Sequence, residues 1–352
     1  MTLINVDGFE LQDYTLRYVQ TAGAGAGGSS TVTTTPFGYG RSLQTAAGSY
    51  STNGNTYRNY KYQLPSASAK LTIGCYYYWG GAGTNSATQR IISVFGDAGA
   101  TLHGFLGVTN AGAINAHNGA ATVLSTVATI VAGWNHFEWT QTVSDTVGTI
   151  EVRMNGVVVY TFSGDTRNGG TLTTLDSFAL GGGSSPTGAS TTSIVRWDDV
   201  YALNDLGSRN NAPLGPCQVQ TLLPNGAGSS TQWSPTAPPN YSDVNDAPDN
   251  SAIYVYDGTA GHRDTYAMDD LQTGTDTIYG VQQVSYARAL DAGPNKLKQA
   301  QKSGATVSYG TTQAVSPTSA SQFDIFEVNP ATGVAYTQSE LNAIEAGFEL
   351  TT

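Results

Sequence analysis

Short segments in which apolar and polar residues alternate are the feature that most constrains the fold of this 352-residue chain. In SAKLTIGCYYYW (68–79), apolar side chains recur at every second position, at Leu71, Ile73, Cys75 and Tyr77. This period places them on one face of a β-strand. Three further segments follow at the short spacing of a meander, RIISVFGD (90–97), LHGFLGVT (102–109) and GAINAHNG (112–119). With 42 glycines and 13 prolines available for turns, the pattern predicts an all-β fold.

The length favours two domains, because 352 residues exceed the usual size of one. The last strong strand pattern of the first half is VRWDDVYALND (195–205), and the polar, Pro- and Gly-containing segment LGSRNNAPLGP (206–216) follows it. Such a segment makes few packing contacts. We therefore predict two β-sandwich (jelly-roll) domains, 1–205 and 217–352, joined by a linker at 206–216.

The second domain contains the one segment that predicts a helix. Thr337 and Glu340 have the spacing of a capping box, and Gly347 is placed to end the helix in a left-handed conformation. The segments 278–290 and 295–310 predict a strand pair, with DAGP (291–294) at the turn. We expect one short helix near the C-terminus in an otherwise β-stranded domain.

Charge and hydropathy exclude two classes of partner. A net charge of −11 without a cluster of Lys and Arg argues against nucleic acid. The chain has no run of about 18 apolar residues, so no membrane span is expected. The opening MTLINVDGFELQ has no basic region followed by an apolar one, so no export signal is expected. Cys75 and Cys217, the two cysteines, are expected to be free thiols.

Paired carboxylates on one strand face would indicate glycosidase chemistry. Gln322, Asp324 and Glu327 in QFDIFEV occupy the three positions of the spacing found in laminarinase-like retaining glucanases. Gln322 stands where that chemistry requires the nucleophile, and an amide cannot form the glycosyl ester. We therefore interpret this segment as a structural strand, and predict no catalytic residues and no enzymatic activity.

The sequence does not decide whether the chain binds a metal ion. Asp198 or Asp199, with Asp205 or Asp7 near in space, could bind Ca²⁺ through oxygen atoms, but exposed carboxylates explain the same residues. The histidines are isolated and form no zinc pattern; they are His103, His117, His136 and His262. The glycine-rich segment 23–28 lacks the lysine and helix of a phosphate loop, so we predict no cofactor.

The segment GWNHFEWTQTVSDTVGTIEVRMNGVVVYTF (133–162) carries a family resemblance. Its Trp134 and His136, and the Asn155-Gly156 dipeptide suited to a type I′ turn, resemble the concanavalin A-like lectin/glucanase fold in its laminin-G-like form. LDSFALGGG (175–183) and 195–205 look like the later strands of that fold. The resemblance implies that the first domain is such a sandwich, with the opening and closing strands paired. His136 is then a strand residue with a hydrogen-bond partner, and Glu138 and Glu151 are ordinary strand carboxylates.

The whole chain, across both domains, resembles tailed-bacteriophage virion proteins more particularly. The matching segments are WDDVYALND, then after a polar linker VQTLLPNGAGSSTQWSP, NYSDVNDAPDN, YAMDDL and the tail NPATGVAYTQSELNAIEAGFEL. This resemblance implies a non-enzymatic virion structural protein, assembled in the host cytoplasm and associated with the tail as a fibre or accessory adhesin. Its expected partners are other tail or capsid proteins, further copies of itself and a host surface glycan. The alternatives are a capsid decoration or head fibre protein, a glycan-degrading tail enzyme and a cellular lectin-like surface protein.

Overall fold

The computed structural model describes residues 2–12, 15, 17–21, 29–45, 59–81, 88–182, 194–246, 252–272, 277–291, 293 and 295–352. The chain divides into two compact units, Met1–Val219 and Gln220–Thr352. The predicted loop at 23–28 lies outside the described residues, as do Gly183 and positions 292 and 294 of the predicted DAGP turn. Both units are built almost wholly from antiparallel strands, which confirms the all-β prediction.

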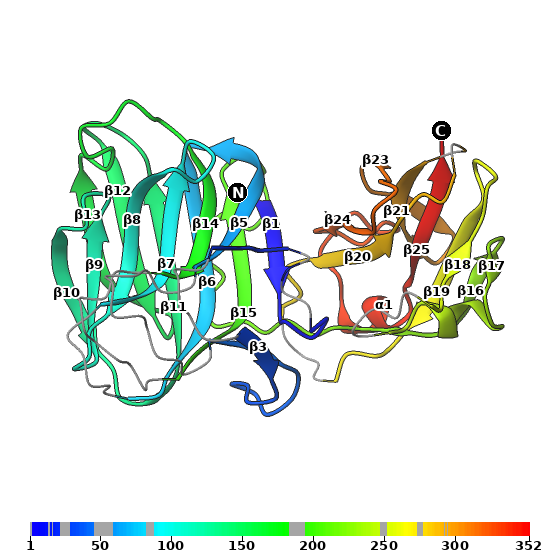
Figure 1. Cartoon of the computed structure of the whole chain (residues 1–352), viewed down its shortest axis with the longest axis horizontal. Helices are drawn as coiled ribbons and strands as arrows, with labels where there is room; N and C mark the ends of the chain where they lie inside the picture. Colours follow the sequence, from blue (N-terminus) through cyan, green and yellow to red (C-terminus); the bar gives the residue numbers. More distant parts are fainter. Residues whose placement is uncertain are drawn as a thin grey trace. The chain divides into compact units, whose positions relative to one another are not determined.

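The first sheet of the first unit has eight strands in the order β13-β12-β11-β6-β15-β4-β3, with β1 paired to β15 (Figure 1). The strands are β1 (Thr2–Asp7), β3 (Ser29–Val32), β4 (Ser42–Thr45), β6 (Lys70–Trp79), β11 (Gly133–Thr142), β12 (Gly148–Met154), β13 (Val157–Gly164) and β15 (Val195–Asn204). Asp7 of β1 lies opposite Val200 of β15, so the opening and closing strands pair as predicted.

The second sheet has seven strands in the order β10-β9-β8-β7-β14-β5-β2. The strands are β2 (Val19–Thr21), β5 (Asn59–Ser68), β7 (Gln89–Gly96), β8 (Thr101–Val108), β9 (Ala113–Asn118), β10 (Val123–Thr129) and β14 (Leu175–Gly181). Strands β7, β8 and β9 form the predicted meander and run side by side in Figure 1.

The core of the first unit lies between these two sheets. Its wall on β6 consists of fully buried residues, Leu71, Ile73, Cys75 and Tyr77, as their alternation predicts. The indole Nε1 of Trp197 in β15 donates to the carbonyl oxygen of Ile91 in β7 (3.0 Å), which ties one sheet to the other. Trp139 and Trp197 are buried here, so these rings serve packing.

The hairpin of β12 and β13 turns at Asn155-Gly156, where both residues have positive φ (50° and 82°). This confirms the predicted turn, which requires φ > 0 at both central positions. The Asn155 side chain also accepts a hydrogen bond from the backbone N–H of His136 in β11 (2.9 Å). The turn is therefore fastened to the neighbouring strand.

The second unit is built around a six-stranded sheet with the order β16-β19-β25-β21-β22 and with β23 paired to β21. Its strands are β16 (Pro224–Thr231), β19 (Arg263–Met268), β21 (Lys296–Ser303), β22 (Thr306–Tyr309), β23 (Gln313–Ala314) and β25 (Glu345–Thr351). Two further pairs accompany it, β17 (Ser234–Pro235) with β18 (Val255–Tyr256) and β20 (Val281–Ala287) with β24 (Ala320–Phe326). A 3-10 turn, η2, spans Asn240–Asp243.

The predicted strand pair of 278–290 and 295–310 is wrong. Strand β20 pairs with β24, and β21 pairs instead with β25, β22 and β23. The segment after β20 leaves the sheet, where Ala289 N donates to the carbonyl oxygen of Ser316 (2.8 Å). The local turn pattern predicted pairing between neighbouring strands, whereas the observed partners β24 and β25 are far from β20 and β21 in the sequence.

The short helix α1 (Gln338–Asn342) has the predicted capping box. Thr337 accepts from the backbone N–H of Glu340 (3.3 Å), and Glu340 accepts from that of Thr337 (2.8 Å). The prediction that Gly347 ends this helix is wrong, because the helix ends at Asn342 with Ala343 as its C-cap, and Gly347 lies inside β25. A Cβ on Gly347 would lie 1.9 Å from the carbonyl oxygen of Asp264, so the close approach of β19 excludes a side chain there.

The segment 206–219 belongs to the first unit in this division. Gly215 N donates to Glu138 Oε1 (2.8 Å), and Leu214 N donates to the hydroxyl of Tyr201 (3.0 Å). The domain boundaries at 205 and 217 stay predictions. None of the helices in the described ranges is long and apolar enough to span a membrane.

Candidate functional site

One row of side chains crosses the outer face of the seven-stranded sheet of the first unit. Lys61, Ala179, Ser93, Phe105 and His117 lie opposite one another on consecutive strands from β5 to β9. Residues that pair directly across a sheet share a face. The core residues alternate with them, so this row faces away from the core. Side chains from five strands are thereby brought together.

A stack of three side chains lies along this row. The ring of Phe105 packs against the ring of His117 with 4.1 Å between centroids and 11° between planes. The guanidinium carbon of Arg90 in β7 lies 4.3 Å from the Phe105 centroid. Because β8 lies between β7 and β9, the two polar groups flank the phenyl ring. The stack holds the arginine and the histidine in fixed positions.

The protonation state of His117 follows from its contacts. Its Nδ1 lies 3.2 Å from the carbonyl oxygen of Ala121, which can only accept, so Nδ1 carries the proton. Burial lowers the pKa of His117, and the nearby charge of Arg90 lowers it further, while the hydrogen bond to Ala121 raises it. The ring is therefore neutral at pH 7, and Nε2 presents a lone pair.

Four polar atoms of this face are buried without a hydrogen-bond partner in the described structure. They are Ser93 Oγ, His117 Nε2, Arg90 Nε and Asn59 Oδ1. The side chains of Asn59 and Arg90 lie on either side of Gly182, each within 3.8 Å of the Cβ position of that glycine. A buried polar atom without a partner costs about 1–3 kcal/mol. We call the set of Asn59, Lys61, Arg90, Ser93, Phe105 and His117 the polar face.

The polar face was not predicted from the sequence. His117 was treated as one of four isolated histidines, and the other five residues were not singled out. The histidine has no neighbour of interest in the sequence, because its contacts come from other strands. Only the register across β5, β14, β7, β8 and β9 brings the set together.

A second polar cluster lies where β1 meets β15. Burial raises the pKa values of Asp7, Asp198 and Asp199, and it raises that of Glu10 to about 8. Charges of neighbouring carboxylates add to the shift at Glu10 and Asp198. The structure thus places Asp7 near Asp198 and Asp199, which was one of the two alternatives in the sequence analysis. Asp205 lies elsewhere and bonds Ser68.

These carboxylates are engaged by backbone N–H groups. Asp7 accepts from Phe9 (2.8 Å), Asp198 from Asp199 (2.9 Å) and Asp199 from Val219 (2.7 Å). Across the described parts of the chain, no group of three His, Cys, Asp or Glu side chains is arranged to hold a metal ion. Asp198 and Asp199 are buried rather than exposed, which corrects the surface interpretation of this pair.

Two sequence interpretations in β11 need correction. His136 is fully buried and neither ring nitrogen has a hydrogen-bond partner, so the predicted partner is absent; its ring packs against Tyr76 (5.0 Å between centroids). Burial lowers the pKa of His136 to about 4. Glu138 is not an ordinary strand carboxylate, because it is buried and accepts from Tyr201 and Gly215. Glu151 is ordinary, half-exposed and paired with Arg153 (2.7 Å).

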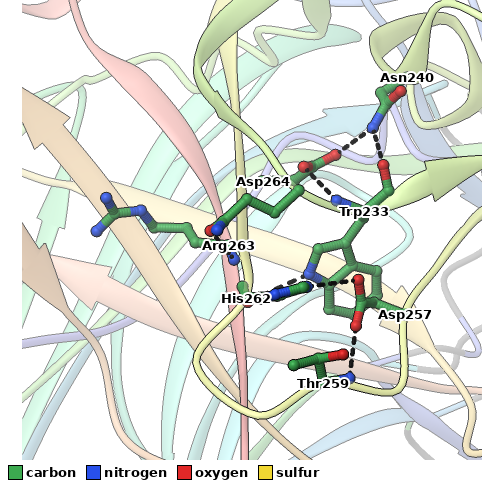
Figure 2. A network of polar contacts seen from close by, with 8 residues as sticks. Trp233, Asn240, Asp257, Thr259, His262, Arg263 and Asp264 are labelled. Carbon is green, nitrogen blue, oxygen red and sulfur yellow. Dashed lines mark hydrogen bonds and ion pairs between the residues drawn. The ribbon is translucent and has the colours of Figure 1, made fainter.

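In the second unit the polar contacts serve the fold. Figure 2 shows Asp264, which accepts from the backbone N–H of Trp233 (2.9 Å) and from the side chain of Asn240 (2.6 Å). The hydroxyl of Tyr266 donates to the same carboxylate (3.0 Å). His262 pairs with Asp257 (2.9 Å) nearby. Asp264 is fully buried with several donors, so it anchors the loop before η2.

The carboxylate segment of the sequence analysis lies at β24. Gln322 is buried, and Asp324 accepts from the backbone N–H and hydroxyl of Thr311 (2.9 and 2.8 Å) and from Gln313 (2.9 Å). The Asp324 carboxylate thus holds a loop beside β22. Both thiols, Cys75 and Cys217, are free, as expected.

Comparison with known proteins gives a likeness of fold. No family model and no curated protein matches the chain. Among solved structures, an endo-1,3-β-glucanase from Streptomyces sioyaensis is 14% identical, with 58% of this chain and 96% of that chain covered and a TM-score of 0.39. The alginate lyase vAL-1 from Chlorella virus is 11% identical, with 58% and 100% covered and a TM-score of 0.37. A structure of botulinum neurotoxin type C, whose cell entry depends on two ganglioside molecules, is 10% identical over 95% and 93%, with a TM-score of 0.37.

The structures in this comparison are sandwich folds of glycan-binding or glycan-degrading proteins, and most are enzymes. This finding contradicts the prediction that the protein has no enzymatic activity. The prediction rested on the lack of a carboxylate pair, whereas a neutral histidine beside an arginine can also perform acid–base chemistry. A likeness of this size assigns no activity to this chain.

Proposed function

We propose that the protein is a bacteriophage virion surface protein whose first unit binds a glycan of the host surface at the polar face. The observation that carries the proposal is the gathering of four unpartnered polar atoms on one side of one sheet. Hydroxyl groups of a sugar both donate and accept hydrogen bonds, so one ligand class can satisfy Ser93, His117, Arg90 and Asn59 together.

Access to the polar face supports the same proposal. Asn59, Lys61 and Arg90 are half-buried, so solvent reaches them, while Ser93 and His117 are buried beneath. A ligand that bonds the first three residues replaces water at the rim. A ligand that also reaches Ser93 and His117 gives hydrogen-bond partners to atoms that have none in the described structure. Partly exposed polar side chains next to buried polar atoms without partners give a ligand such as a glycan both a surface to contact and hydrogen bonds to complete.

Affinity electrophoresis tests the glycan site. The chain is run in gels that contain dextran, laminarin, polygalacturonate or dextran sulfate, and retardation is measured against a plain gel. Ser93→Val removes the hydroxyl from the polar face, and Ser163→Val is the matched control on β13 of the other sheet. We expect retardation of the wild type and of the control, and a loss in the Ser93 variant. No retardation in any gel, or equal retardation of all three chains, contradicts the proposal.

The virion location rests on the sequence resemblance of the tail segment to phage proteins, together with the proposed glycan contact. Many weak contacts on one particle become effective through avidity, which suits a surface protein present in several copies. Mass spectrometry of phage particles purified by sedimentation tests it. The chain should co-purify in a fixed ratio to the other particle proteins, and its absence from intact particles contradicts the location.

Cleavage of the bound glycan is the second candidate function. The specific observation is the neutral His117, whose Nε2 can accept a proton. Reducing ends released from the same four polysaccharides measure this activity. Release that disappears in His117→Gln but persists in the His262→Gln control supports cleavage at the polar face. If both variants still release reducing ends, cleavage occurs away from the polar face.

A further inference from the structure

The polar face carries two positive charges that form no ion pair. Lys61 and Arg90 take part in none of the four ion pairs found among the described residues. Lys61 lies opposite Val19 and Ala179, and Arg90 lies opposite Gly107, so neither faces a carboxylate directly across the sheet. The carboxylate of Asp176 lies near Lys61, because it accepts from the backbone N–H of Gly99 (3.2 Å). In a chain with a net charge of −11, Arg90 is thus a cation with no ion pair among the described residues and no carboxylate directly opposite it.

The surroundings of Arg90 suit an anion. One side of its guanidinium covers the Phe105 ring, and its Nε is buried without a partner. Burial lowers the pKa of Arg90, which means that the charged form has lost hydration that no protein group in the described structure replaces. A planar guanidinium fork matches the two oxygens of a carboxylate and bonds them in pairs.

Lys61 supplies a second cation on the same row. Its ammonium donates to the carbonyl oxygen of Gly99 (2.6 Å) and lies 4.8 Å from the Phe95 centroid. An ammonium has three donors, so two remain after this bond. The Gly99 contact holds the charge in place without neutralising it.

His117 narrows the class of anion. Its Nε2 lone pair repels a second negative group and accepts from a hydroxyl. The polar face therefore fits a sugar that carries one carboxylate beside free hydroxyls. We infer, resting on the proposed glycan site, that the ligand is a uronate-containing polysaccharide and that Arg90 binds its carboxylate.

Binding to polygalacturonate and to the same polymer with methyl-esterified carboxyls tests the inference on the intact wild-type chain. Esterification keeps the sugar backbone and removes the charge. We expect affinity for the ester to fall about 10-fold or more, as for the loss of a charged hydrogen bond. Equal affinity for the two polymers, or for dextran, overturns the inference while the proposed glycan site stands. Binding to laminarin alone likewise overturns the inference only. If the chain binds none of polygalacturonate, its ester, dextran, laminarin and dextran sulfate, both proposals are contradicted.

Variants of Arg90 test whether this residue binds the carboxylate of the uronate. Arg90→Gln should weaken binding to polygalacturonate about 10-fold, and Arg90→Lys should not restore it, because an ammonium lacks the paired donors. Arg153→Gln makes the same charge change on β12 of the other sheet and should leave binding unchanged. An Arg90→Gln chain that melts like the wild type and binds as tightly overturns the assignment. Tighter binding of the wild type to dextran sulfate than to polygalacturonate overturns the choice of a carboxylate.

Discussion

The half-buried carboxyl of Glu10 should make the stability of the first unit depend on pH. Its side chain lies against Gly8 and Gly40, where a Cβ would approach its carboxylate oxygens to 2.3 and 2.4 Å. Burial first, and then the charges of Asp199 and Asp7, raise its pKa from 4.5 to about 8. The folded unit therefore keeps a proton at pH 6–7 that the unfolded chain has released.

The sign and size of the effect follow from proton linkage. The stabilisation from Glu10 is fully present below pH 4.5, where both states are protonated, and is lost as the pH rises to about 8. Within this window one proton corresponds to a fall in the free energy of unfolding of about 1.4 kcal/mol per pH unit. The whole window amounts to about 5 kcal/mol as an order of magnitude. Glu10→Gln cannot titrate, so its curve should be flatter by this slope.

Urea denaturation followed by tryptophan fluorescence at pH 5, 6, 7 and 8 measures this difference. Four of the five tryptophans lie in the first unit, so the signal reports mainly on that unit. Glu151→Gln is the control, because its half-exposed carboxylate pairs with Arg153 at the surface. The reasoning is refuted if Glu10→Gln shows the same dependence on pH as the wild type and the control.

Two further predictions concern the second unit, and calorimetry of the full chain checks both. Asp264→Ala leaves the donors of Trp233, Asn240 and Tyr266 without their acceptor, so the second unit should lose about 3 kcal/mol or more, and an unchanged melting temperature contradicts this. Thr337→Ala removes the helix cap and should cost about 1 kcal/mol, while a loss as large as that of Asp264→Ala would show that the threonine does more than cap.

Much of the fold could be predicted because its signals are local. Alternation at Leu71, Ile73 and Tyr77 identified a strand and its core face, and Asn155-Gly156 identified a turn. The capping box at Thr337 identified the helix. The β20 pairing failed because the strand that β20 joins, β24, lies more than thirty residues further along the chain. Register and strand order over such separations leave no mark in a local pattern.

The polar face could not be predicted for the same reason. Strand β14 lies between β5 and β7 in space although about eighty residues separate it from β7 in sequence. Only this insertion places Lys61 in one row with Ser93 and His117. The acidic cluster was partly accessible, since Asp7 and Asp199 lie in strands predicted to pair. Glu10 was missed because it follows β1 in a turn.

Hydrogen–deuterium exchange of the full chain with oligosaccharides of polygalacturonate tests the central claim most directly. The amides of β5, β7, β8 and β9, which carry the polar face, should gain protection on binding. The hairpin of β12 and β13 and the second unit should exchange as in the free chain. Protection confined to residues 220–352, or to the hairpin of β12 and β13, would contradict the account, because the glycan would then bind away from Arg90 and His117.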